Sequence, residues 1–156
     1  MNTVFQVADY FLNKACNEED GGELISNLKL QKLIYYAQGF HLAMFDKPLF
    51  EERLEAWNHG PVCPELYNDK KKYKQGGIEP NANFDASVFT NSQKELLDEI
   101  YEVYGQFSAW KLRNLTHEEE PWRNNIEISR QNTFIPYSGS IISHDDLKKY
   151  FKTKLN

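Results

Sequence analysis

Apolar side chains recur every three to four residues in several stretches of the chain, which places them on one face of an α-helix. The longest stretch starts after Ser26 or Asn27, either of which can cap a helix, and runs to about Phe45. Its apolar stripe is wide and aromatic, so we expect a central helix roughly 27 Å long. Further helices are predicted over Val4 to Ala15, from Pro64 through Lys74, after a Ser92/Glu95 capping box, after Ser108 and after Ser143.

The segments between these stretches carry turn-forming or irregular patterns. Leu49 to Trp57 indicates a short strand or an irregular arm, and His59 to Val62 contains the Gly and Pro of a turn. Gln75 to Asn91 is typical of a flexible or poorly ordered loop, because Gly, Pro, Asn and Asp are frequent in it. A brief helix or turn is expected after the segment from Thr116 to Trp122, and Ile135 to Ile142 favours a loop or short strand. We therefore expect a mainly α, compact single domain over residues 1–156, with about five or six helices and at most a small β element.

Composition and charge narrow the classes of partner. Acidic side chains number 23 and basic ones 18, a formal net charge of -5, so a nucleic-acid partner is disfavoured. The N-terminus lacks the pattern of a signal peptide, and no stretch approaches the length of a membrane span, so we expect a cytoplasmic protein. Cys16 and Cys63 form no CxxC pair, which predicts neither a zinc site nor a disulfide framework.

The four histidines do not form a recognisable catalytic or metal-binding pattern. His117 precedes three acids, but a zinc-binding helix needs two histidines one turn apart with a Glu between them. We expect the acids to form a solvated helix end, and we expect no catalytic residue, metal or cofactor. Two alternatives stay open: an enzyme using His59 or His117 with nearby acids, and a nucleic-acid or host-protein binder acting through Lys70 to Lys74.

Three blocks in order resemble the Panacea antitoxin family, which includes SocA-like proteolytic adaptor antitoxins and phage- or prophage-associated proteins. The first is Leu30-Gln31-Lys32-Leu33-Ile34-Tyr35-Tyr36-Ala37-Gln38-Gly39. The second joins Glu55-Ala56-Trp57 to Gly60-Pro61-Val62, followed by Tyr67, and the third joins Leu115-Thr116-His117 to Pro121-Trp122. Each block is moderately specific, whereas all three in this order are strongly so.

The resemblance implies an antitoxin that neutralises a cognate protein toxin in a direct complex, with the toxin encoded by an adjacent gene. Delivery of the toxin to a protease is a further mode that the family implies, and the oligomeric state stays open. Exposed aromatic rings, Trp110 among them, could anchor such a complex. The residues predicted to bind the partner are Lys32, Tyr35, Tyr36, Phe40, His41, Trp57, His59, Gly60, Pro61, Tyr67, His117 and Trp122.

Overall fold

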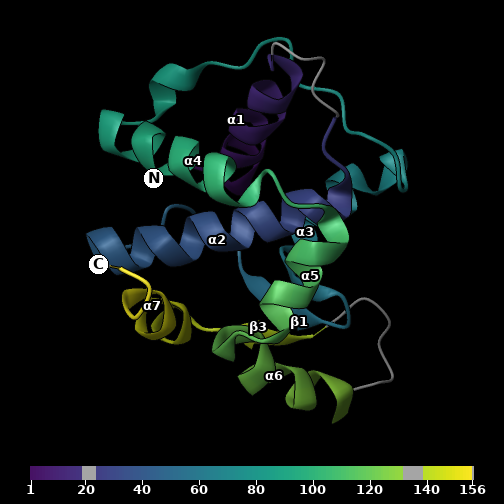
Figure 1. Ribbon diagram of the computed structural model, residues 1–156, viewed down its shortest axis with the longest axis vertical. Coiled ribbons are helices and arrows are strands. Elements are labelled where there is room, and N and C mark those ends of the chain that lie inside the picture. Colours follow the sequence, from purple (N-terminus) through teal and green to yellow (C-terminus); the bar gives the residue numbers. More distant parts are fainter. Residues whose placement is uncertain (19–23, 132–138, 156) are drawn as a thin grey trace.

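The helix α2 (Asn27–Phe45) runs through the centre of the molecule (Figure 1). The computed structural model describes residues 1–18, 24–131 and 139–155. Fourteen of the nineteen residues of α2 are buried, as in a helix that other elements enclose on all sides. Ser26 caps the helix by accepting a hydrogen bond from the backbone N–H of Lys29. The predicted central helix is confirmed.

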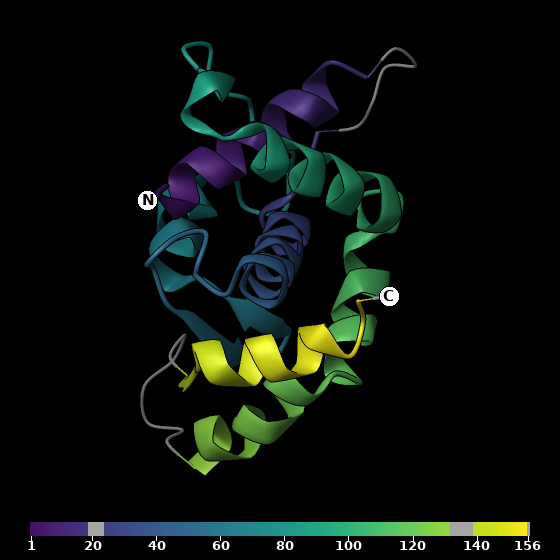
Figure 2. The ribbon, with the colours of Figure 1, turned by 90° about the vertical axis from the view of Figure 1, so that its left-hand side faces the viewer.

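The other helices surround α2, which is seen nearly end-on in Figure 2. Helices α1 and α4 lie on one side of it, and α5, α6 and α7 lie on the other (Figure 1). The described residues thus form seven α-helices, a mainly α fold as expected, with one or two more helices than predicted. The six besides α2 are α1 (Val4–Cys16), α3 (Pro64–Lys70), α4 (Asn91–Tyr104), α5 (Ala109–His117), α6 (Glu120–Gln131) and α7 (His144–Lys152).

Side-chain caps begin most of these helices. Ser108 and Ser143 cap α5 and α7 as predicted. The capping box of α4 is formed by Thr90 and Gln93, so the predicted pair Ser92 and Glu95 was wrong. Both pairs have the same spacing, and Thr90 takes the cap because its backbone is extended while the helix already begins at Asn91.

The β element is a three-stranded antiparallel sheet in the order β2-β1-β3. Its strands are β1 (Leu54–Trp57), β2 (Gly60–Val62) and β3 (Ser140–Ile142). The strand predicted within Leu49 to Trp57 is confirmed, whereas most of the expected His59 to Val62 turn is strand β2. Because β2 is an edge strand, Pro61 is tolerated there although it has no N–H to donate. The turn itself is Asn58 and His59.

Three other segments differ from the prediction. Helix α3 ends at Lys70 and continues as a 3₁₀ turn over Lys71–Tyr73, while α6 extends for twelve residues where only a brief helix or turn was expected. The loop after Gln75 contains a 3₁₀ turn over Ala86–Val88. The buried side chains of Ile78 and Phe89 attach this loop to the core. The polar composition of the loop did not indicate these contacts with distant parts of the chain. Of the predicted 135–142 element, residues 135–138 lie outside the described residues.

One hydrophobic core extends from α1 to α7 around the central helix. At Gly39 the ring of Phe151 from α7 lies so close that an added Cβ would be 2.2 Å from it. A glycine therefore lets α7 pack directly on the backbone of α2. The assignment of residues 1–156 to one domain stays a prediction.

The helices that the structure describes include none with the length and apolar character required to cross a membrane.

Candidate functional site

The three sequence blocks lie against one another, although they are distant in the sequence. The first block belongs to α2, the second forms the β1–β2 hairpin, and the third forms the corner between α5 and α6. Side-chain hydrogen bonds join them: Lys32 bonds to Pro61, and Trp122 bonds to Trp57. The blocks therefore act together as a clasp that fixes the hairpin and the α5–α6 corner to the central helix.

The first contact of this clasp is a buried cation. Lys32 is fully buried, and its Nζ donates a hydrogen bond to the carbonyl oxygen of Pro61 at 3.1 Å. Burial, and to a smaller extent the positive charge of Arg113, lowers the pKa of Lys32 to about 7. Among the ion pairs of the described residues, none includes Lys32. A lysine in a helical pattern is normally solvated, so this burial is unusual.

Gly60 is required where the hairpin approaches Lys32. Its φ of +107° lies in the region that favours glycine, and an added Cβ would lie 2.8 Å from both Lys32 Cε and Thr116 Oγ1. The position of Gly60 is thus fixed from both sides, by α2 and by α5.

The second contact joins two tyrosines to one carboxylate. The hydroxyls of Tyr35 and Tyr36 each donate to a different oxygen of Glu119, both at 3.0 Å. Burial raises the pKa of Glu119 to about 7 and outweighs the two hydrogen bonds, which lower it. Tyr36 also stacks on Tyr104 with 3.8 Å between ring centroids. Glu119 was expected to be a solvated helix end, but it is an internal partner of α2.

The third contact is made by the aromatic residues of the hairpin and α6. The indole N–H of Trp122 donates to the carbonyl oxygen of Trp57 at 2.7 Å. His117 stacks on Trp122 with 3.8 Å between ring centroids and 4° between ring planes. The Nε2 of His117 is buried without a hydrogen-bond partner. Burial, aided by the cations Arg113 and Lys32, lowers the pKa of His117 to about 4, so the imidazole is a neutral packing group at neutral pH.

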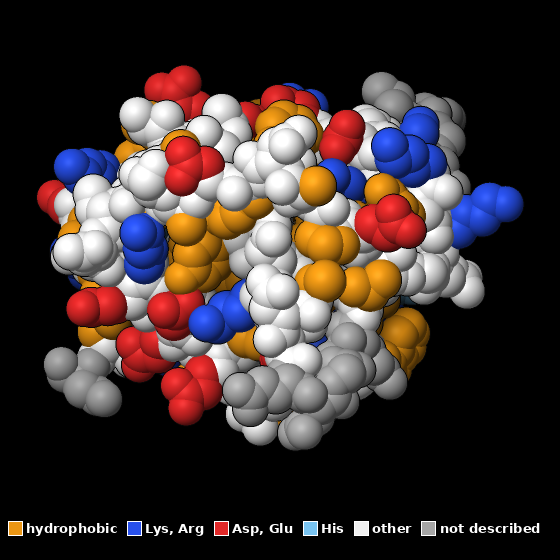
Figure 3. Space-filling view, turned by 90° about the horizontal axis from the view of Figure 1, so that it is seen from above, with side chains coloured by type: hydrophobic (Ala, Val, Ile, Leu, Met, Phe, Trp, Pro, Cys, Tyr) orange, Lys and Arg blue, Asp and Glu red, His pale blue; other side chains and the backbone are white. Residues whose placement is uncertain are grey.

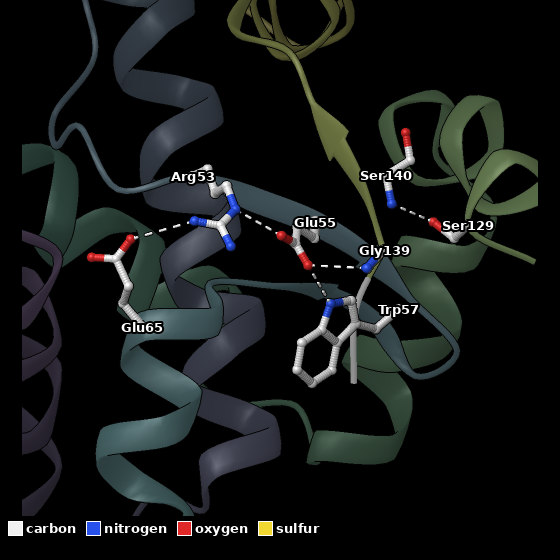
Figure 4. Close-up of polar contacts among 7 residues, drawn as sticks. All are labelled: Arg53, Glu55, Trp57, Glu65, Ser129, Gly139 and Ser140. Atoms are coloured by element: carbon white, nitrogen blue, oxygen red, sulfur yellow. Dashed lines mark hydrogen bonds and ion pairs between the residues drawn. The ribbon is translucent and has the colours of Figure 1, made fainter. Parts of the chain in front are cut away.

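Glu55 organises the hairpin from inside (Figure 4). Its side chain is buried and accepts hydrogen bonds from Arg53 Nε at 2.7 Å, from Trp57 Nε1 at 3.0 Å and from the backbone N–H of Gly139 at 3.0 Å. The Trp57 ring also packs on Tyr67, with 5.1 Å between centroids. These hydrogen bonds fix the orientation of the Trp57 indole and attach the residue before β3 to β1.

His41 and Phe40 lie further along α2, away from the hairpin contacts. His41 is buried, and its Nδ1 lies 2.7 Å from the carbonyl oxygen of Lys47, beyond the end of the helix. Phe40 packs on Phe151 of α7, with 4.8 Å between ring centroids. These two residues stabilise the C-terminal half of α2 and do not join the clasp.

Most of the predicted partner-binding side chains do not reach the surface. The buried ones are Lys32, Tyr35, Tyr36, His41, Gly60, Pro61 and Trp122, and their role in binding a partner stays a prediction. Phe40, Trp57, Tyr67 and His117 are partly exposed, and His59 is exposed. They were predicted as contacts from the family resemblance and from residue type, and residue type does not distinguish a core ring from an interface ring.

The exposed groups beside His59 come from α5. Trp110 is 56% exposed, and the guanidinium of Arg113 lies over its ring at 4.3 Å from the centroid. Arg113 Nε donates to His59 Nδ1 at 3.0 Å. We call Trp110, Arg113 and His59 the α5 surface. Arg113 was missed in the sequence, although Leu112 and Leu115 mark the inner face of α5 and so leave Trp110 and Arg113 on its outer side.

The histidines and acids do not gather into a metal-binding group. Within residues 1–18, 24–131 and 139–155, no cluster of three or more His, Cys, Asp or Glu side chains could hold a metal ion. Cys16 is exposed and Cys63 is buried, and both are free thiols. The lysines from Lys70 to Lys74 lie at the end of α3 and in the following 3₁₀ turn, where Lys70 pairs with Asp69.

A groove between α1 and α4 marks the opposite side of α2. It has a volume of about 1090 Å³, and its face carries intermixed acidic, basic and apolar side chains (Figure 3). Its polar groups bond to one another: Lys14 pairs with Asp98 at 3.0 Å, and Tyr101 donates to Glu18 at 2.7 Å. These internal pairs leave the groove without the concentration of one charge that the α5 surface has.

When the chain is compared with known protein families, all three blocks lie within the region that matches one family. Residues 30–123 match the family described as antitoxin SocA-like, Panacea domain. Antitoxin SocA from Caulobacter vibrioides (strain NA1000 / CB15N) is 51% identical over 43 residues, which are 28% of this chain and 23% of that protein. The aligned part thus covers about a quarter of the curated relative. No solved structure matches the chain.

Proposed function

The chain belongs to the antitoxin SocA-like Panacea domain family, and from this membership we propose that it neutralises a cognate toxin by forming a direct complex with it. The observation that carries the proposal is the family match over residues 30–123, which contains the three blocks first seen in the sequence. The expected resemblance is thereby confirmed. The curated relative, an antitoxin by name, supports the same role.

The internal clasp supports a binding role because it produces a rigid surface. Hydrogen bonds hold the hairpin on the central helix and α6 on the hairpin before any partner arrives. A preformed surface loses less conformational entropy on association than a flexible one. A standard interface needs about 800 Å² per partner, roughly a tenth of the 8815 Å² accessible surface of this chain. The domain is therefore large enough to cover part of a toxin.

Direct neutralisation requires no catalytic step from this chain. The two histidines considered for an enzyme have other contacts: His117 packs on Trp122, and His59 accepts a hydrogen bond from Arg113. We accordingly propose that the partner is a protein toxin encoded by the adjacent gene and that inhibition results from complex formation alone.

Coexpression with the adjacent reading frame tests the proposal. The neighbour alone should arrest growth, this chain should restore growth, and the two tagged proteins should co-purify. A copy of this gene with an early stop codon is the matched control. A harmless neighbour, or rescue without a complex, would contradict the proposal.

Toxin turnover separates direct neutralisation from proteolytic delivery. If the complex itself inhibits, the half-life of the toxin after translation is blocked should not shorten when this chain is present. A purified stoichiometric mixture should also lose toxin activity without any protease. A half-life that falls severalfold only when this chain is expressed would assign it a delivery role.

A further inference from the structure

The α5 surface contains cations that no carboxylate of the described chain neutralises. Arg113 forms none of the ion pairs found in the described residues, and neither does Lys32 directly behind the hairpin. Burial lowers the pKa of both Lys32 and His59; the charge of Arg113 adds to both decreases, and the charge of Lys32 adds to that of His59. These cations lie in a chain whose formal net charge is -5.

Arg113 is held in one orientation with part of its guanidinium still available. Trp110 supports one face of the group at 4.3 Å, Nε donates to His59 at 3.0 Å, and one terminal nitrogen donates to Asn114 at 3.0 Å. The remaining N–H groups are given no hydrogen-bond partner by the residues described. A planar guanidinium with a free edge matches a carboxylate in geometry and charge.

His59 adds a second donor to the same surface. Because its Nδ1 accepts the hydrogen bond from Arg113, the proton of the neutral ring must be on Nε2. The side chain is exposed at the hairpin turn, so this N–H is accessible to a partner. Arg113 thus fixes the tautomer that presents a donor.

We propose that the α5 surface is a docking site for an acidic segment of a partner protein. An Asp or Glu carboxylate of that segment binds Arg113 and His59, and a neighbouring apolar side chain covers Trp110. The inference rests on the proposed function, because it gives the chemistry of the segment that a toxin would present. Trp and Arg are the residue types most enriched among interface residues that dominate binding energy.

The charges favour a protein segment over a nucleic acid. A polyanion must approach many acidic side chains of this chain, whereas one carboxylate needs only the local field of Arg113 and Lys32. The exposed indole next to Arg113 also provides apolar area, which a carboxylate-bearing peptide can cover with an adjacent side chain. Single-stranded nucleic acid, which also stacks on aromatic rings, is the competing occupant that the test must include.

Selection from a displayed random peptide library against the immobilised full chain tests the site without any toxin. We expect the recovered peptides to share an Asp or Glu beside an apolar residue. Trp110→Ala and Arg113→Gln should each weaken their binding by about tenfold or more, and raising the salt concentration should weaken binding to the unaltered chain. Arg113→Lys keeps the charge without the planar fork and should have an intermediate effect.

Two variants outside the α5 surface serve as controls. Ile128→Ala removes an apolar side chain that is 49% exposed on α6, and Arg130→Ala removes a cation of the same helix. Both should bind the peptides normally, and circular dichroism should give all variants the unaltered helix content. The measured effect then belongs to the α5 surface.

Three results would overturn the inference. One is a failure to enrich acidic sequences, and another is acidic peptides that bind Trp110→Ala and Arg113→Gln as well as the unaltered chain. The third is a single-stranded oligonucleotide that binds with higher affinity than the peptides and is lost in the same variants. Because no toxin is used, these results are independent of the growth rescue that tests the proposed function.

Discussion

The ammonium of Lys32 donates a hydrogen bond to the carbonyl oxygen of Pro61, so a fully buried cation on the central helix holds the edge strand of the hairpin. Burying a charge without a carboxylate partner is unfavourable for folding. The same charge strengthens the positive field around Arg113 on the surface. Lys32 thus connects the stability of the chain to the proposed docking of an acidic partner.

Replacing this buried cation should stabilise the chain. Burial lowers the pKa of Lys32 from 10.5 in the unfolded chain to about 7 in the folded chain. The side chain therefore costs no folding free energy above the unfolded pKa, where it is neutral in both states, and the cost grows as the pH falls and is complete below the folded pKa. Lys32→Met should therefore raise the free energy of unfolding near pH 7 by about 1–4 kcal/mol, and by less near pH 10. Urea unfolding at both pH values measures the difference. Destabilisation at both would mean that the hydrogen bond to Pro61 outweighs the cost of burial.

Glu119 should produce the opposite dependence on pH. Its pKa is raised from 4.5 to about 7, so its contribution to stability is complete below the unfolded pKa and is lost as the pH rises through the folded one. Glu119→Gln removes this titration and should gain about 1–2 kcal/mol relative to the unaltered chain between pH 5 and pH 8, after allowance for partial exposure.

Glu118→Gln is the matched control for this experiment, because Glu118 is the exposed neighbour of Glu119. It should alter the pH dependence far less, because the charge of Glu118 is the smallest of the influences that shift the pKa of Glu119. If Glu119→Gln and the unaltered chain lose stability equally from pH 5 to pH 8, the titrating group lies elsewhere.

Elements with strong local signals could be predicted from the sequence. Helix α2 has a cap at Ser26 and a long apolar pattern, and Ser108 and Ser143 begin α5 and α7 as expected. The Gly60–Val62 strand was missed because Gly and Pro favour a turn locally, while its pairing depends on β1. Pairing between two segments cannot be recognised from the hydrophobic pattern of either segment alone.

The sequence identified the segments that form the candidate site, but it did not identify which of their side chains are buried and which are exposed. The blocks containing Lys32, Trp57 and His117 do meet in the structure. The burial of Lys32 could not be predicted, because a Lys in a helical pattern is normally solvated. Arg113 became a candidate only when the fold placed it between Trp110 and His59.

Substitution of Gly60 should destabilise the clasp. Gly60→Ala introduces a Cβ 2.8 Å from Lys32 Cε and Thr116 Oγ1 at a φ of +107°, so both strain and crowding result. We expect a loss of about 1–3 kcal/mol in the free energy of unfolding. Gly76→Ala, where the nearest atom would be 3.3 Å away, should cost less. Equal losses in the two variants would show that Gly60 is not specially required.

Glu55 should control the attachment of β3 independently of global stability. Glu55→Gln removes the negative charge and replaces one carboxylate oxygen with an amide N–H₂, which faces a donor in either orientation, Arg53 Nε or the pair Gly139 N–H and Trp57 Nε1 (Figure 4). The hydrogen bonds that remain lose the negative charge of their acceptor. A buried donor left without an acceptor costs about 1–3 kcal/mol, so the Gly139 amide should exchange with deuterium roughly ten- to a hundredfold faster.

The Ile78 amide, which donates to Ile25 at 2.8 Å in another part of the chain, should exchange at its original rate. Glu65→Gln is the matched control, because Glu65 also faces Arg53 at 3.8 Å but is exposed. Faster exchange at both Gly139 and Ile78 would indicate global unfolding and would contradict the local role of Glu55. Faster exchange confined to Gly139 means that this carboxylate fixes the residue before β3 in addition to the backbone pairing of β3 with β1, because no other acceptor for that amide is provided by the described residues.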